Sequence, residues 1–113
     1  MPTRRNLSGY KIMWMFVMFD LPVTDAKARR QYARFRKRLL KEGFSMLQYS
    51  VYARSFPSEE ASQAYRARVN GALPPEGQVR VVSITDRQFG KMEVYVGRSR
   101  RVPEKPPDQL MLF

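Results

Sequence analysis

The feature that most constrains the fold is the apolar run "IMWMFVMFD" at residues 12–20, which ends in the carboxylate of Asp20. Successive side chains of a strand point to opposite faces of its sheet. One face would carry Met13, Met15, Val17 and Phe19, and the other Ile12, Trp14, Phe16, Met18 and Asp20. Both faces are apolar, which predicts a central strand. Because helices on one side of a sheet bury only one face, we expect another cover for the second, most simply a dimer partner.

Length and residue content narrow the choice of chemistry. A chain of 113 residues with 43% hydrophobic content suits one compact domain. It contains no cysteine and no histidine. This composition excludes disulfides, thiolate or imidazole zinc sites, cysteine nucleophiles, serine–histidine triads and histidine-based ribonuclease chemistry. Any hydrolysis would have to depend on carboxylates and a metal ion.

The apolar run is too short to be a membrane anchor. Its uncharged part covers residues 12–19 and ends at Asp20, whereas a helix that spans a bilayer needs about 20 apolar residues. We therefore expect a cytoplasmic protein without a membrane partner.

The rest of the chain alternates between helix and strand patterns. A helix capped by Thr24 or Asp25 should end before Gly43, and a second helix should begin at Ser58 and close at Gly71. Residues 44–56 are too long for one typical strand and favour two, with a break near 48–50. Two further strands are expected at 78–85 and 92–97.

This order predicts an α+β protein of the ferredoxin-like βαββαβ type, with one extra strand and a C-terminal strand. Both helices would cover one face of an antiparallel sheet, and the open face would let Trp14 and Phe16 meet the partner of a homodimer. The domain should span residues 1–97. Residues 98–113 would form an extended, proline-containing tail that ends in an apolar docking strand, because the tip "QLMLF" is too apolar to remain in water.

Positive charge concentrates on the first predicted helix. The chain has a net charge of +11, and residues 25–42 account for six of these charges. Arg30, Arg34, Lys37 and Lys41 recur at helical spacing, with Arg38 near their edge. A solvated helix face is the ordinary explanation of such a row, but this one has few acidic partners. It therefore favours contacts with phosphates, with little base preference and strong salt dependence.

An RNA-recognition module would share the same element order. Such a module shows stacking aromatic residues in a glycine-containing motif of its third strand. The corresponding stretch here, "SVYARSF", has no glycine. This alternative is therefore weakly supported.

Asp20 has two interpretations at this stage. An aspartate before a Leu-Pro turn often accepts hydrogen bonds from nearby backbone amides. Alternatively it could bind Mg2+, which uses one or two carboxylates and retains several waters. Two Asp20 side chains across a two-fold axis would make a plausible site, and a metal there could polarise a phosphodiester and activate water.

Three segments together resemble the CRISPR-associated protein 2 family of prokaryotic adaptive immunity. These are "MFDLP" at 18–22, the arginine-rich "KARRQYARFRKRLLKEGF" at 27–44 and "MLQYSVYAR" at 46–54. Within the last, Gln48, Ser50, Val51 and Tyr52 are similar to the family's Gln-x-Ser-Val-aromatic signature. The proline-containing tail resembles the version that accompanies single-effector (type II) systems.

The resemblance implies a homodimeric scaffold at the centre of the spacer-integration complex, flanked by dimers of the CRISPR integrase and holding duplex DNA. On this hypothesis the nucleic-acid-binding residues are Lys27, Arg29, Arg30, Arg34, Lys37, Arg38 and Arg54. The tail would add a strand to a partner's sheet or to the integrase. Alternatively, "QLMLF" is similar to peptides that bacterial replication proteins insert into the sliding clamp.

The resemblance also implies a second possible activity. Some family members are described as metal-dependent nucleases of single-stranded RNA or duplex DNA, with the strand-end aspartate as magnesium ligand. That role would fall on Asp20, as catalytic and metal-binding residue. This chain has Phe19 where the family usually has tyrosine, so a hydroxyl at that position is absent. A third possibility is an RNA-binding accessory domain that prefers single strands.

Overall fold

The computed structural model describes residues 11–97 and 101–102. In chain order its elements are β2 (Met13–Asp20), α1 (Ala26–Lys41), β3 (Ser45–Gln48), β4 (Val51–Phe56), α2 (Glu59–Gly71), β5 (Gln78–Thr85), α3 (Asp86–Gly90), β6 (Val94–Tyr95) and β7 (Arg101–Val102). The predicted docking strand at the C-terminal tip lies outside the described residues.

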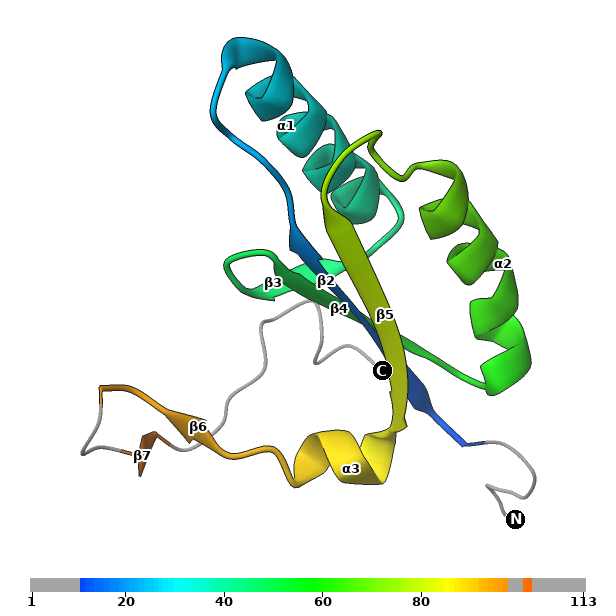
Figure 1. Cartoon of the computed structure of the whole chain (residues 1–113). Coiled ribbons are helices and arrows are strands. Elements are labelled where there is room, and N and C mark those ends of the chain that lie inside the picture. The colour runs from blue at the N-terminus through cyan, green and yellow to red at the C-terminus, as the bar shows by residue number, and fades with distance from the viewer. Residues whose placement is uncertain (1–10, 98–100, 103–113) are drawn as a thin grey trace.

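Four strands form one antiparallel sheet in the order β3-β4-β2-β5. The apolar run therefore forms the inner strand β2, as expected, with β4 and β5 on its two sides. Figure 1 shows α1 and α2 next to each other on one side of this sheet, and α3 at the far end of β5. The arrangement is α+β and compatible with the ferredoxin-like fold.

Local sequence signals explain where the elements begin and break. Asp25 caps α1 by accepting a hydrogen bond from the Ala28 amide at 2.8 Å, and Ser58 caps α2 by accepting from the Ala61 amide at 3.1 Å. Between β3 and β4 the chain turns at Ser50, whose φ is +64°. The predicted caps and the predicted break between these two strands are confirmed.

The face of the sheet under α1 and α2 holds the larger core. Met15 and Val17 of β2 are fully buried there. They belong to the same apolar cluster as Phe35 and Leu39 of α1 and Val69 of α2. This packing fixes the rotation of α1, so the side of the helix opposite Phe35 and Leu39 faces solvent.

The second face differs from the prediction, because α3 covers part of it. Trp14 is only 1% exposed. Its indole stacks on Phe89 of α3, with ring centroids 3.9 Å apart, and its Nε1 donates a hydrogen bond to Asp86 at 2.8 Å. The expectation that Trp14 would be open to a partner is therefore wrong. Farther along this face Phe16 is half-buried and Val82 is 42% exposed, so some apolar surface remains.

The strand expected at 92–97 is shorter than predicted. Only Val94–Tyr95 is extended, as β6, and it pairs with the backbone of β7 in a separate two-stranded sheet. Between the two predicted strands, where no element was expected, the chain forms α3, which starts with a capping box between Thr85 and Gln88.

Candidate nucleic-acid interface and strand-end carboxylate

The outer face of α1 is a strongly basic surface. Phe35 and Leu39 are the buried residues of α1 and define the side of the helix that faces the core. Four exposed residues, here called the basic stripe, lie away from the core: Arg30, Arg34, Lys37 and Lys41. Within residues 11–97, no carboxylate forms an ion pair with any of them. The positive charge of the stripe is therefore available to an external anion.

A groove of about 620 Å³ runs beside part of this stripe. Arg34, Lys37, Arg38 and Lys41 line one wall, while residues 71–75, from the last residue of α2 onward, line the other. No acidic side chain is among the described residues that line it. A groove with one basic wall and no carboxylate attracts polyanions such as a phosphate backbone.

Two predicted contact residues lie nearer the start of α1 and have other neighbours. Arg29 donates a hydrogen bond to the Val23 carbonyl oxygen at 3.3 Å, which fastens the helix to the preceding loop. Lys27 is exposed and lines a smaller cavity of about 180 Å³ together with the carboxylates Asp25 and Glu76. Lys27 therefore lies in a mixed-charge environment, unlike the basic stripe.

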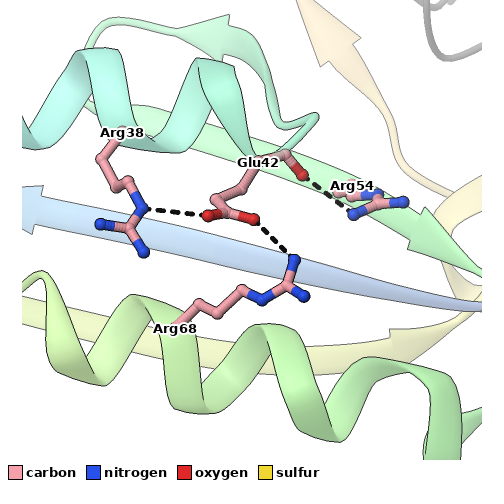
Figure 2. A network of polar contacts seen from close by, with 4 residues as sticks. All are labelled: Arg38, Glu42, Arg54 and Arg68. Carbon is pink, nitrogen blue, oxygen red and sulfur yellow. Dashed lines mark hydrogen bonds and ion pairs between the residues drawn. The ribbon is translucent and has the colours of Figure 1, made fainter.

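Arg38 takes part in an ion-pair network around Glu42, shown in Figure 2. The Glu42 carboxylate accepts hydrogen bonds from Arg38 Nε at 3.0 Å and from Arg68 of α2 at 3.0 Å. These two hydrogen bonds hold the pKa of the Glu42 carboxyl below its usual value. The network joins the C-terminal end of α1 to α2.

Arg54 is also held within the protein. Its guanidinium donates to the backbone carbonyl oxygen of Glu42 at 2.9 Å, as Figure 2 shows. It also lies over the rings of Tyr65, at 4.0 Å from the centroid, and Phe56, at 4.7 Å. Arg54, and to a lesser extent Arg68, lowers the pKa of the Tyr65 phenol. Arg54 therefore stabilises the packing of β4 against α2, and the structure does not bring it to the basic stripe.

Asp20 is the exposed last residue of β2 and pairs in register with Gln78 of β5. Gly77 makes this close pairing possible. It has a φ of +95°, and a Cβ there would lie 2.7 Å from the backbone oxygen of Asp20. The backbone at Asp20 is thus closely packed while its side chain faces solvent.

The Asp20 carboxylate has no structural partner among the described residues. The sequence-level alternative, a carboxylate bonded to nearby amides, is seen instead at Asp25, which caps α1. Asp86 accepts from Trp14, and Glu42 accepts from two arginines. Asp20 is therefore a carboxylate whose oxygens can serve a ligand.

The residues around Asp20 meet only part of what a metal site requires. In the part of the chain that the structure describes, no three acidic side chains gather into a group that could hold a metal ion. One hard oxygen donor fits Mg2+ only if waters, a substrate phosphate or a second Asp20 supply the other ligands. The donor chemistry suits magnesium, and one chain alone supplies too few ligands.

Sequence reasoning missed the role of Glu42 and the existence of α3. Arg38 and Glu42 are four residues apart at the end of a predicted helix, so their ion pair could have been predicted from the sequence. The ion pair between Glu42 and Arg68 joins residues 26 positions apart, and no sequence pattern predicts it. No helix of residues 11–97 is long and apolar enough to cross a membrane.

Comparison with known proteins agrees with the sequence resemblance. The family model described as CRISPR associated protein Cas2 matches residues 13–92. A protein of Parvibaculum lavamentivorans, called CRISPR-associated endoribonuclease Cas2, is 50% identical over 89% of this chain and 100% of its own length. Proteins with the same name from Flavobacterium psychrophilum and Streptococcus mutans are 42% and 36% identical, over 96% and 89% of this chain and 94% and 92% of their own lengths.

Proposed function

This chain belongs to the CRISPR-associated Cas2 family, and from that premise we propose that it is a DNA-binding scaffold for spacer acquisition in antiviral defence. The observation that carries the proposal is the basic stripe of α1, which is exposed and has no acidic partner within residues 11–97. Phosphate contacts position a nucleic acid without reading its sequence. A scaffold that must accept spacers of any sequence needs this kind of surface.

The scaffold would work as a cytoplasmic homodimer together with dimers of the CRISPR integrase. Val82, on the part of the second sheet face that α3 leaves uncovered, is 42% exposed, and burying it would favour association of two copies. A two-fold axis would give the duplex two copies of the basic stripe. Both the dimer and the integrase contact are part of this proposal.

Duplex binding as a function of salt tests the proposal. We expect the wild type to bind duplexes of unrelated sequence with similar Kd values. The variant Arg30→Gln/Arg34→Gln/Lys37→Gln/Lys41→Gln should bind weakly, and the slope of log K against log salt should fall by about 0.9 for each phosphate that the variant no longer neutralises. The matched control is Arg87→Gln/Lys91→Gln, which removes exposed charges from α3 and its C-cap beyond the other face of the sheet.

Circular dichroism should show that both variants remain folded, since all these side chains are exposed. If the stripe variant keeps the affinity and salt slope of the wild type, the stripe does not contact DNA. The control variant removes two charges and the stripe variant four. If each charge removed costs the same affinity in both variants, only the total charge matters, and a specific interface is excluded.

A second candidate function rests on Asp20. Its carboxylate is exposed and has no partner among the described residues, which favours a magnesium-dependent endonuclease of single-stranded RNA or duplex DNA. Bound magnesium would polarise the phosphodiester and activate water. Asp20 would hold the ion at the strand end, and the positive charge of α1 would hold the substrate.

Cleavage of labelled single-stranded RNA and duplex DNA, with magnesium or with EDTA, tests this candidate. Asp20→Asn should abolish magnesium-dependent cleavage while duplex affinity remains nearly unchanged. Asp25→Asn is the matched control, because asparagine is also a good N-cap and should preserve α1. Equal cleavage by the wild type and Asp20→Asn would exclude Asp20 as metal ligand. If the wild type cleaves neither substrate, the nuclease candidate is rejected and only the scaffold function remains.

A further inference from the structure

Tyr49 is the most exposed large aromatic or aliphatic side chain in the described part of the chain, at 73% of its full surface. It lies in the turn between β3 and β4. An aromatic ring of this size is costly to leave in water, and a turn is ordinarily occupied by small or polar residues. Its exposure therefore favours a ligand that would cover the ring.

The ring of Tyr49 is held in place and does not hang freely from the turn. It stacks on Tyr32 of α1, with centroids 5.9 Å apart and an angle of 22° between the planes. Tyr32 in turn packs edge-on against the buried Phe19 and shares a hydrogen bond of 3.1 Å with the Ser50 hydroxyl. These contacts hold the exposed ring of Tyr49 in place before any ligand binds.

The turn that carries Tyr49 is also bonded to the strand end that carries Asp20. The Phe19 amide donates a hydrogen bond to the Ser50 carbonyl oxygen at 3.1 Å. The aromatic ring and the Asp20 carboxylate are thus brought to the same end of the sheet. The chemistry proposed for Asp20 acts on a phosphodiester, whose neighbouring base would lie in this region.

Positive charges lie on α1 beside the Tyr32 support. Arg29 and Arg36 are three residues before and four residues after Tyr32, so they share its side of the helix, and both are exposed. A tyrosine phenol is uncharged at neutral pH and does not repel phosphate, and the neighbouring Tyr32 raises the pKa of Tyr49 further. An uncharged aromatic ring next to arginines has the composition of a single-strand-binding surface.

We propose that Tyr49 stacks on an unpaired base of a single-stranded nucleic acid whose phosphates pass Arg29 and Arg36, an inference that rests on the proposed nucleic-acid-binding function. Bases within a duplex are already stacked on each other and cannot use this ring. Tyr49 therefore makes the protein distinguish a single strand, or the unpaired end of a duplex, from a continuous duplex. The basic stripe cannot make this distinction, because phosphates occur in single strands and in duplexes alike.

The test compares Tyr49→Ala, Tyr49→Phe and the wild type on a single-stranded RNA that carries 2-aminopurine, and on a blunt DNA duplex. Stacking contributes enough per base that Tyr49→Ala should weaken RNA binding by roughly 5- to 100-fold and abolish quenching of the 2-aminopurine. Tyr49→Phe keeps the ring and should behave like the wild type. The matched control is Tyr95→Ala, which removes another exposed tyrosine, 58% exposed on β6.

Duplex affinity should be the same in all four proteins. The inference is overturned if Tyr49→Ala binds and quenches the RNA like the wild type, or if the wild type binds duplex but no single strand. In both cases salt-dependent duplex binding would leave the proposed function intact. Failure of the wild type to bind either ligand would instead reject the proposed function, and the inference with it.

Discussion

The basic stripe of α1 and the network around Glu42 use similar side chains in opposite ways. Arg34 is exposed and has no acidic partner in the described part of the chain, whereas Arg38, four residues later, is bound to Glu42 at 3.0 Å. Arg54 is held still more firmly, between a backbone carbonyl oxygen and two aromatic rings. A single acid, close to the end of the helix, separates the two environments.

This difference shows that the number of arginines does not measure the size of a phosphate-binding surface. The sequence predicts seven residues in contact with nucleic acid, and the structure divides them by their local partners. The exposed residues of the basic stripe can exchange water and counterions for a ligand, whereas Arg38 must first break its ion pair with Glu42. Arg54 must first leave the Glu42 carbonyl oxygen and two aromatic rings. Affinity should therefore depend on position more than on net charge.

The largest expected effect on folding comes from Arg54→Ala. This change leaves the Glu42 carbonyl oxygen unpaired and removes the cation from the rings of Tyr65 and Phe56. The free energy of unfolding should fall by about 2–3 kcal/mol, with a Tm lower by about 10 °C. Thermal and urea unfolding would measure both.

Arg54→Lys sharpens the same point, because it keeps the charge but lacks the planar group that stacks on the rings. It should lose much of the stability and keep the duplex affinity of the wild type. A variant with normal stability but weakened, less salt-dependent DNA binding would instead assign Arg54 to the phosphate interface.

A smaller, pH-dependent effect is expected for Glu42→Gln. Bonds from Arg38 and Arg68 lower the pKa of Glu42 in the folded protein from its ordinary value of 4.5. Its stabilising contribution is therefore present above pH 4.5 and is lost as the pH falls through the lowered pKa. The wild type should be more stable than the variant at neutral pH, and this difference should shrink in acid.

Urea unfolding at several pH values, from about 7 down to about 3, measures that difference across the range where a carboxyl titrates. The same substitution releases two arginines and removes a negative charge, so duplex affinity at neutral pH should rise slightly. An unfolding difference that is constant over this pH range would show that Glu42 is not ionised in the network.

The smallest effect is the contrast between Arg34→Gln and Arg38→Gln, each of which removes one positive charge from α1. Arg34→Gln should reduce the salt slope of duplex binding by about 0.9 and the affinity by a few-fold. Arg38→Gln should change the slope less, because Glu42 already neutralises that guanidinium. Equal slopes for the two variants would remove the distinction between stripe and network.

Much of the fold is readable from the sequence because its signals are local. The caps at Asp25 and Ser58, the turn before β4 and the apolar alternation of β2 each depend on residues within one or two turns of chain. The outward position of the basic stripe also follows from helical periodicity. These features require no knowledge of which segments meet.

What could not be predicted depends on contacts between distant segments. α3 has only five residues, too few for a periodic pattern, and its contact with Trp14 joins residues 72 positions apart. Likewise, nothing near Arg54 in the sequence indicates that Tyr65 and the Glu42 carbonyl will surround it. From its charge alone, Arg54 is therefore predicted to contact phosphate. The sequence also does not show whether the Asp20 carboxylate caps a turn or is free to bind a ligand.

The contact between Trp14 and Phe89 supplies the protein with an internal optical probe. Trp14 is the chain's one tryptophan, and its indole is buried against α3, so its emission reports on that contact. A buried indole emits at shorter wavelength than one in water. Detachment of α3, for example when a partner competes for this face of the sheet, would shift the emission to the red while α1 and α2 remain folded.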